Sequence, residues 1–169
     1  MKGAGVGLIV LLLALACLGA GAQDQGLGAK VKTDQEVVLI KTPPEILSRQ
    51  KLPNFVGVSG KTAGARGLSM NLVIIPPGAS AEPHFHRDFE SAVYVLEGRV
   101  ETRYGPGLES SVITEAGDFL FIPPNVPHQP VNLSTTEAAR AIVVRNDPNE
   151  QEHVVLYDPV SEPGRDGSE

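Results

Sequence analysis

Residues 78–98 read GASAEPHFHRDFESAVYVLEG, and this stretch decides what fold and chemistry the chain is expected to have. It contains His84 and His86, separated by one residue, and Glu90 follows after three more. Alternate side chains of an extended strand lie on the same face, so the two histidines are expected to point the same way. Two imidazoles with a carboxylate nearby are ligand types that first-row transition metals prefer. The stretch therefore predicts a metal site.

A second stretch, residues 117–132, reads GDFLFIPPNVPHQPVN and supplies a third histidine. His128 follows a proline-rich turn and begins a strand-like run. Three imidazoles and a glutamate leave two positions open in an octahedral shell, where water, substrate or dioxygen can bind. The two stretches thus carry four residues of metal-binding type, which are His84, His86, Glu90 and His128.

The two stretches resemble the paired motifs of the cupin superfamily. The first motif reads Gly, five residues, His-x-His, three or four residues, Glu, six residues, Gly. The second reads Gly, five residues, Pro-x-Gly, two residues, His, three residues, Asn. The residues of this chain that stand at motif positions are Gly78, His84, His86, Glu90, Gly117, Pro123, His128 and Asn132. The resemblance covers the middle third of the chain and implies a jelly-roll barrel whose motif strands line one mouth. It also implies one divalent metal ion per chain (Fe, Mn, Zn, Ni or Cu), held by His84, His86, Glu90 and His128.

The chain departs from the two motifs at two places. Asn125 stands where the second motif has glycine, and we expect it to adopt a positive φ, which asparagine tolerates. Seven residues rather than six separate Glu90 from Gly98, so counting back from Gly98 puts Ser91 at the carboxylate position. Because serine is a poor ligand for these metals, we predict that Glu90 is the ligand. A β-bulge between Glu90 and Gly98 would then absorb the extra residue.

Composition and charge favour one compact, soluble-type domain of many short strands. The chain has 169 residues, 41% of them hydrophobic, with 18 glycines and 14 prolines. Glycine and proline in this proportion are typical of strands joined by turns. The net charge is −6, from 14 basic and 20 acidic residues. Nucleic acid is therefore excluded as a partner, because phosphates select a basic surface.

The N-terminal segment is expected to direct export. Lys2 precedes an apolar run at residues 6–18, and the small residues 20–22 offer a cleavage site before Gln23. The alternatives are an uncleaved anchor, for which the run is short, and a lipoprotein attached through Cys17. Since Cys17 is the only cysteine, the processed chain would contain neither a disulfide nor a thiol nucleophile. We expect a periplasmic or secreted protein that has no membrane contact after processing.

Short strands separated by turn residues are expected to fill the chain after residue 35, with no long helix. Strands are predicted at residues 36–41, 53–59, 70–75, 91–97, 99–104, 111–114, 119–122, 129–133, 139–145 and 153–157, and a helical turn at 45–50. This pattern predicts an all-β protein, and the resemblance implies a double-stranded jelly-roll β-barrel (cupin) with an N-terminal arm. The expected division is a signal peptide at 1–22, a linker and N-terminal arm at 23–50, the cupin jelly-roll domain at 51–158 and a disordered acidic tail at 159–169.

Two of the expected strands carry more apolar residues than one buried face needs. Residues 70–75 and 119–122 are apolar at nearly every position, whereas a strand open to water on one face alternates. We therefore expect a second covering surface. It would be supplied by a homodimer or by the N-terminal arm.

Three further residues invite a functional interpretation. If Glu90 faces the cavity, Tyr94 lies on the same face of a regular strand. Its phenol is then a candidate catalytic acid, with core aromatic packing as the alternative. His153 lies outside both motifs and is interpreted as a strand-end residue. Asn132 begins a formal glycosylation triplet, but it also completes the second motif and is expected to be structural.

Residues 90–98, ESAVYVLEG, resemble a group of single-domain cupins described as RmlC-like or predicted mannose-6-phosphate-isomerase-like. The resemblance implies a metal-dependent enzyme, isomerase-like or dioxygenase-like, that acts on a small polar or aromatic molecule. The alternative is a non-catalytic protein in which the metal anchors a small molecule or carbohydrate. A metal-free sugar epimerase is disfavoured by the three motif histidines. Fold does not choose between these activities.

Overall fold

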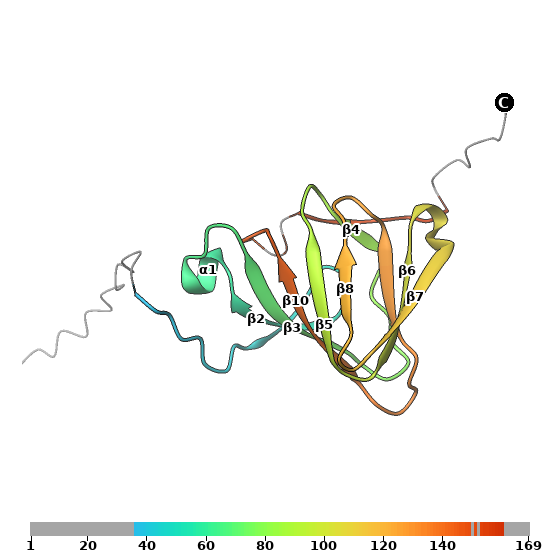
Figure 1. Ribbon diagram of the computed structural model, residues 1–169, viewed down its shortest axis with the longest axis horizontal. Helices are drawn as coiled ribbons and strands as arrows, with labels where there is room; N and C mark the ends of the chain where they lie inside the picture. The colour runs from blue at the N-terminus through green and yellow to red at the C-terminus, as the bar shows by residue number, and fades with distance from the viewer. Residues whose placement is uncertain (1–35, 150, 152, 161–169) are drawn as a thin grey trace, which may run out of the picture. The chain divides into compact units, whose positions relative to one another are not determined.

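The computed structural model describes residues 36–149, 151 and 153–160, and the regular secondary structure of this part is almost entirely β-strand (Figure 1). The predicted signal peptide at 1–22, the segment up to residue 35 and the tail from 161 onward lie outside the described residues. None of the helices in the described part is long and apolar enough to cross a membrane.

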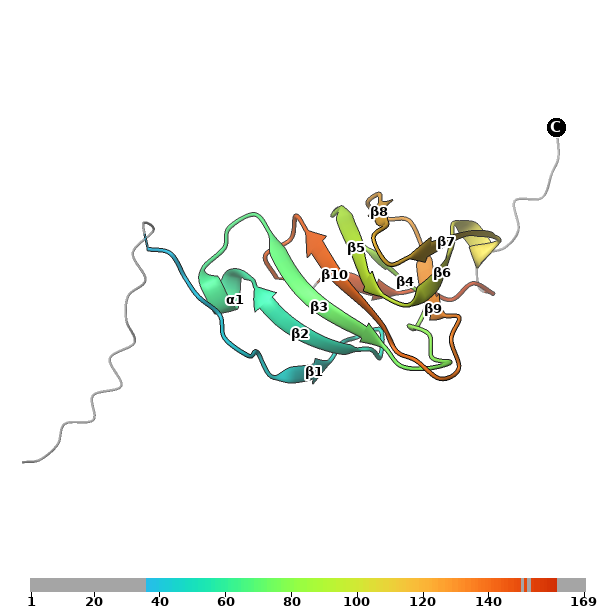
Figure 2. The ribbon, with the colours of Figure 1, turned by 60° about the horizontal axis from the view of Figure 1, so that its bottom comes forward.

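The strands form two antiparallel sheets, as predicted for a jelly roll (Figures 1 and 2). The first sheet has the order β1 (Glu45–Leu47), β2 (Pro53–Val58), β3 (Ser69–Ile75), β10 (Ala139–Arg145), β5 (Ser91–Glu97), β8 (Phe119–Ile122). The second has the order β11 (Val154–Leu156), β4 (His84–His86), β9 (His128–Asn132), β6 (Arg99–Tyr104), β7 (Ser110–Glu115). Helical structure between residues 36 and 160, as far as these are described, is limited to one turn, α1 (Gly60–Ala63), and the 3-10 turn η1 (Pro106–Leu108).

Most predicted strands are confirmed to within one or two residues, but two predictions near the N-terminal end are wrong. Residues 36–41 form no strand, and residues 45–47 form β1 rather than a helical turn. β1 pairs with β2, with Glu45 opposite Phe55 and Leu47 opposite Pro53. Tertiary pairing thus overrides the weak local preference of a short segment.

Side chains of the first sheet alternate between the interior and the outer surface. On β10, Ala141, Val143 and Arg145 line an interior cavity, which fixes the intervening residues on the outer face. A small apolar cluster in the interior consists of Leu52, Ile75, Ala81, Val100 and Ala139. Three members of this cluster, Leu52, Ile75 and Val100, also line the cavity in which the motif histidines lie.

Gly98 and Asn132 are fixed by their surroundings in the way the motifs require. Gly98 has φ +87°, and a Cβ there would lie 2.8 Å from the Cα of Ala139. Asn132 is buried, and its amide nitrogen donates to the carbonyl oxygens of Ile75 (3.0 Å), Pro76 (3.2 Å) and Glu137 (2.7 Å). Its amide oxygen accepts from the Ser134 N–H at 2.9 Å. The structural role predicted for Asn132 is confirmed.

The predicted positive φ of Asn125 is also confirmed, at 62°. Its backbone N–H donates to the carbonyl oxygen of His86 at 3.0 Å, and its side chain exchanges two hydrogen bonds with Asp88. The turn before β9 is therefore tied directly to the end of β4, and this contact brings the two histidine-bearing strands into register.

Candidate metal centre

Three histidines from two neighbouring strands meet in the interior. His84 and His86 project from β4, and His84 stands opposite His128 of β9 in the antiparallel pairing. All three side chains are buried, and one nitrogen of each lies within 4.8 Å of the others. The ring centroids are 4.3 Å apart for His84 and His128, and 5.1 Å and 5.3 Å for the pairs that include His86. Nitrogen atoms that share an ion with bonds of about 2.1 Å lie roughly 3.0–3.4 Å apart, so the rings have to move closer together to bind one ion.

Backbone hydrogen bonds orient two of the rings toward one another. Nδ1–H of His84 donates to the carbonyl oxygen of Glu82 at 2.8 Å, and Nδ1–H of His128 donates to that of Val126 at 2.9 Å. In each case the partner is two residues earlier, so the same local geometry is used twice. A donor on Nδ1 leaves the lone pair on Nε2, which is how metal-binding histidines are commonly held.

The environment keeps these imidazoles neutral at neutral pH. Burial lowers the pKa of His84 well below its ordinary value, with the neighbouring His128 and Arg145 adding to the effect. Burial lowers the pKa of His128 to about 4. Burial and the Arg145 charge lower the pKa of His86 as well. Neutral imidazole is the form that binds metal ions, so the donor set fits a divalent transition metal.

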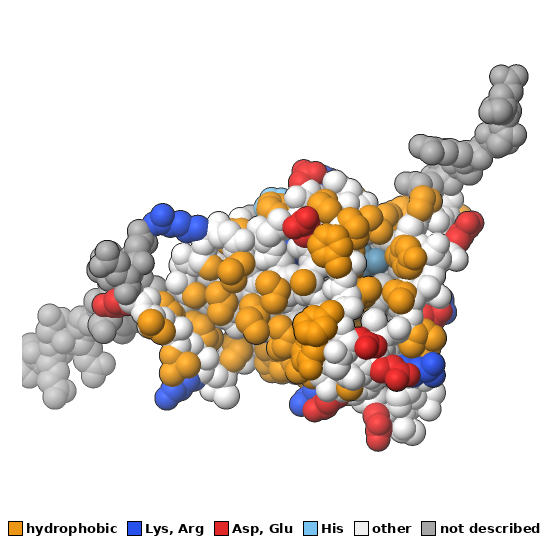
Figure 3. Space-filling view, viewed as in Figure 1, with side chains coloured by type: hydrophobic (Ala, Val, Ile, Leu, Met, Phe, Trp, Pro, Cys, Tyr) orange, Lys and Arg blue, Asp and Glu red, His pale blue; other side chains and the backbone are white. Residues whose placement is uncertain are grey.

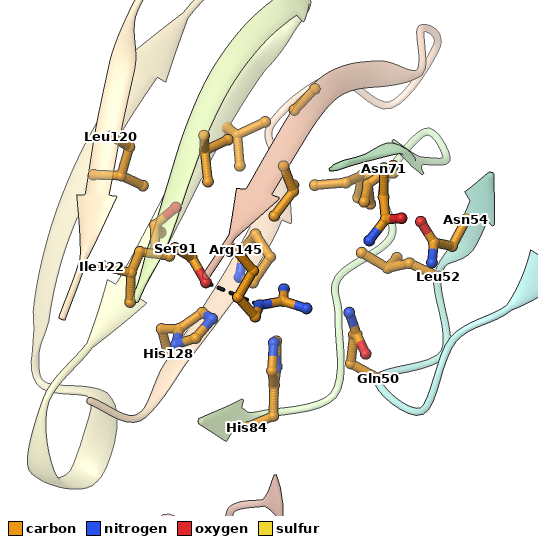
Figure 4. A pocket seen from close by; sticks show the side chains of 18 of the residues that line it. Gln50, Leu52, Asn54, Asn71, His84, Ser91, Leu120, Ile122, His128 and Arg145 are labelled. Atoms are coloured by element: carbon orange, nitrogen blue, oxygen red, sulfur yellow. Dashed lines mark hydrogen bonds between the residues drawn. The ribbon is translucent and has the colours of Figure 1, made fainter. Parts of the chain in front are cut away.

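A buried arginine lies against the histidines. The guanidinium of Arg145 donates from Nε to Ser91 Oγ at 3.1 Å (Figure 4). It also donates from Nη2 to His86 Nε2 at 3.2 Å. The His86 lone pair is therefore engaged, whereas its Nδ1 has no hydrogen-bond partner among the described residues. A metal ion bound through His86 Nε2 has to replace the hydrogen bond from Arg145.

Replacing Arg145 with glutamine is expected to tighten divalent-metal binding by at least about tenfold. The substitution removes a positive charge that disfavours cations at all three histidines, together with a donor that competes for His86. Titration of Zn(II) into metal-free protein measures the effect. Arg140→Gln is the matched control, because Arg140 lies on the outer face of the same strand beside Glu97. Equal affinities for the parent and Arg145→Gln would contradict this account.

The structure does not bring Glu90 to the histidines, and the predicted ligand set is corrected accordingly. The Glu90 side chain is exposed and lines a separate outer groove, whereas Ser91 is buried in the cavity wall. The ligand group in the described part of the chain consists of His84, His86 and His128. The position that faces the cavity is the one found by counting back from Gly98, and it is occupied by Ser91.

The reason lies in the segment between β4 and β5. Asp88 has φ 64°, so the alternation of faces cannot be carried from His86 across residue 88 into the next strand. The predicted bulge is present: the pairing of β5 with β10 passes from Glu97 opposite Arg140 to Val95 opposite Ala141. The bulge lies at Leu96, so it does not change the alternation of the residues before it. Ser91, Val93 and Val95 face the cavity, and Glu90 therefore faces the outer surface.

Glu90→Ala is therefore expected to leave metal affinity within about twofold of the parent, as for other exposed substitutions remote from a site. Ser91→Glu is expected to raise the affinity by at least about tenfold, because it puts a carboxylate on the cavity wall beside the histidines. Metal titration of the two metal-free variants and the metal-free parent measures both affinities. Loss of metal from Glu90→Ala would restore the four-ligand prediction.

Tyr94, the candidate catalytic residue, lies on the outer face of β5. It is partly exposed, and its ring packs against Phe119 with a centroid separation of 4.7 Å. Tyr94 does share a face with Glu90, as predicted, but that face points away from the cavity. His153 also lies outside the histidine group, and its Nδ1 pairs with buried Asp147 at 2.8 Å.

Several polar residues that line the cavity were not predicted from the sequence, and they include Gln50, Asn54, Asn71 and Arg145. For Arg145 a signal was present, since two arginines five positions apart on one strand must face opposite sides. Arg140 and Arg145 are such a pair on β10, so one of them had to point inward. The three amides carry no comparable pattern in the sequence.

Comparisons with known proteins agree with this geometry. Residues 71–145 match the family model described as "Cupin domain". The polyketide cyclase RemF from Streptomyces resistomycificus is 24% identical, with a TM-score of 0.57 over 73% of this chain and 89% of that chain. A Cupin 2 conserved barrel domain protein from Salinispora arenicola is 22% identical, with a TM-score of 0.54 over 69% of this chain and 92% of that chain.

A larger protein shares the same fold in one part. The oxalate decarboxylase from Lactobacillus farciminis, in a formate complex, is 21% identical with a TM-score of 0.54 over 63% of this chain. The match covers 31% of the decarboxylase, so this chain corresponds to about a third of it. No curated protein sequence matches the chain. At these identities the solved structures establish the cupin fold, as the motifs implied.

Proposed function

The chain contains a cupin domain, and from that premise we propose that it binds one divalent first-row metal ion and acts on a small polar molecule in the cavity. One observation carries the proposal. Three buried histidines present nitrogens within 4.8 Å of one another, and they do so at the wall of a cavity rather than in a closed core. Structural metal sites are closed by protein ligands, whereas a three-ligand site leaves positions for a substrate.

The chemistry that the bound ion supplies is polarisation of a ligand oxygen as a Lewis acid. His84 and His128 are held in one tautomer by their backbone partners, so their orientation is set before the ion arrives. Arg145 places a guanidinium against His86, where it donates hydrogen bonds to oxygen atoms that approach the same space. Apolar side chains, including Val93, Val95 and Ile122, line the rest of the cavity and limit the entry of water.

The candidate metals are Fe, Mn, Zn, Ni and Cu, since all of these ions bind neutral imidazole. One structurally similar protein, the oxalate decarboxylase of Bacillus subtilis, has Mn(II) centres, which supports manganese as a candidate. That similarity, at 17% identity, supports no particular reaction. The proposal is therefore a metal-dependent enzyme, with metal-anchored binding of a small molecule as the outcome if no turnover is found.

Cobalt substitution tests the proposal directly. Co(II) added to metal-free protein is expected to give a visible spectrum with one equivalent bound per chain, because its d–d bands report the ligand shell. Small hydroxylated and carboxylated compounds are then expected to change that spectrum by occupying the open positions. A Co(II) spectrum that no such compound alters would show that the site is closed, and the proposal would fail.

We further propose a homodimer formed through the outer face of the first sheet. Figure 3 shows hydrophobic side chains gathered over this face, and they include Phe119, 82% exposed, and Phe121, 59% exposed. Phe121→Lys is expected to convert a dimer to a monomer, because it buries a charge in an apolar contact. Light scattering measures the mass, with Ile113→Lys on β7 of the second sheet as the control. A monomeric parent protein would contradict the proposal.

Export remains a proposal that rests on the N-terminal sequence alone. The apolar run and the small residues before Gln23 support cleavage at that point. The mass of the processed chain tests it, because retention of Met1 or a lipid on Cys17 would contradict cleavage before Gln23.

A further inference from the structure

Three side-chain amides line the cavity with oxygen atoms that have no hydrogen-bond partner in the described part of the chain. Gln50 lies in the turn before β2, Asn54 is on β2 and Asn71 is on β3. Their exposed fractions are 7%, 2% and 3%. The amide oxygen of each is buried without a partner among the described residues. Figure 4 shows the amide ends of Asn54 and Asn71 close together and turned into the cavity, with Gln50 beside His84.

This arrangement is costly for a protein that needs the amides only for its fold. A buried polar group left without a hydrogen bond costs on the order of 1–3 kcal/mol, so such groups are rare and call for an explanation. Asn132 shows how the same fold treats a structural asparagine: it is equally buried and makes four hydrogen bonds. Three unpartnered amides around one cavity therefore indicate a ligand.

We propose that Gln50, Asn54 and Asn71 form a subsite for a small, hydroxyl-bearing molecule, whose other end faces the histidines. An amide presents both an acceptor oxygen and two N–H donors. A hydroxyl group also both donates and accepts, so it satisfies either end of an amide. A carboxylate accepts only and leaves the three amide oxygens unpaired.

The cavity also limits the size of this ligand. Its volume is about 80 Å³. At roughly 15 Å³ for each water that such a space holds, it has room for about five waters. The ligand is thus a compound of about three carbons with hydroxyl groups along its length. In Figure 4 the guanidinium of Arg145 lies between the histidines and the amides, where it can contact the middle of such a molecule.

Glycerol is the probe, and 1-propanol is the matched compound with the same carbon number and one hydroxyl. In NMR titrations of the Zn(II)-loaded protein, glycerol is expected to shift the side-chain NH₂ signals of Gln50, Asn54 and Asn71, with a Kd on the order of millimolar. 1-Propanol is expected to bind at least about tenfold more weakly. Asn54→Leu and Asn71→Leu are each expected to weaken glycerol binding about tenfold or more while metal content is unchanged.

The melting temperatures of amide variants distinguish a ligand-binding role of the amides from a role in the fold. Because the amides are unpartnered, Asn54→Leu and Asn71→Leu are expected to keep or raise the melting temperature of the ligand-free protein. Asn132→Leu, the control, is expected to lower it, since four hydrogen bonds are lost. A lower melting temperature for both Asn54→Leu and Asn71→Leu would assign the amides to the fold and overturn the proposal.

The proposal rests on the proposed function for the placement of the ligand, but the two fail separately. Glycerol that shifts the three NH₂ signals in both metal-free and metal-loaded protein supports the subsite even if no metal chemistry follows. If metal binds but glycerol leaves these signals unmoved, the amides hold only water. The subsite is then wrong and the metal site stands.

Discussion

Replacing His128 with alanine is expected to weaken divalent-metal binding by at least about a hundredfold. Loss of a residue that merely supports a metal ligand costs roughly 10–100-fold in affinity, and loss of a ligand costs more. His128 stands opposite His84 in the pairing of β9 with β4, so no other described side chain of the group can take its place. Calorimetric titration of Zn(II) or Mn(II) into metal-free protein measures the change.

His153→Ala is the matched control for this experiment. His153 is the fourth histidine of the chain, it pairs with Asp147, and it lies outside the ligand group. Its replacement is expected to leave metal affinity at the parent value. If His128→Ala binds metal as the parent does, the histidine cluster is not the metal site.

The metal-free protein is expected to lose stability steeply as the pH falls from 7 to 5. In the folded state the pKa of His128 is about 4, and those of His84 and His86 also lie below the ordinary value of 6.5. Below pH 6.5 the unfolded chain therefore binds protons that the folded chain does not. Folding stability is complete above this pH and declines as the pH falls toward the folded-state values.

The size of this effect follows from the number of histidines. Each contributes at most about 1.4 kcal/mol per pH unit, so three contribute on the order of 4 kcal/mol between pH 7.5 and 5.5. That is a large share of a typical unfolding free energy of about 5–15 kcal/mol. Urea unfolding at pH 7.5, 6.5 and 5.5 measures it. His128→Gln is expected to reduce the slope by about a third, and bound metal to shift the whole decline to lower pH.

Much of the fold followed from residue patterns. β5, β6, β8 and β10 begin and end at the predicted residues, because alternating or doubly apolar runs between turn residues define strands clearly. The first strand was misplaced because its pairing with β2 is a tertiary contact that residues 36–50 do not encode locally. The pairing order of the strands and the position of the cavity likewise depend on contacts between distant residues.

The site could be predicted where strand alternation applies and not where it is interrupted. His84 and His86 lie on one regular strand, and their common face was inferred correctly. Glu90 was misplaced because Asp88, with a left-handed φ, separates it from that strand. Tyr94 was predicted to face the cavity by counting from Glu90, so the error at Glu90 led to the same error at Tyr94. Asparagine and glutamine in a strand are compatible with either face, so Asn54 and Asn71 became visible only in the structure.

Elemental analysis of protein purified without added metal tests the central claim most directly. The account predicts about one equivalent of a single first-row divalent metal per chain in the parent and in Glu90→Ala. It predicts less than about a tenth of an equivalent in the double variant His84→Ala, His128→Ala, whose site keeps one ligand of three. A metal-free parent that also takes up none when reconstituted, or a double variant that retains a full equivalent, would contradict the three-histidine metal centre.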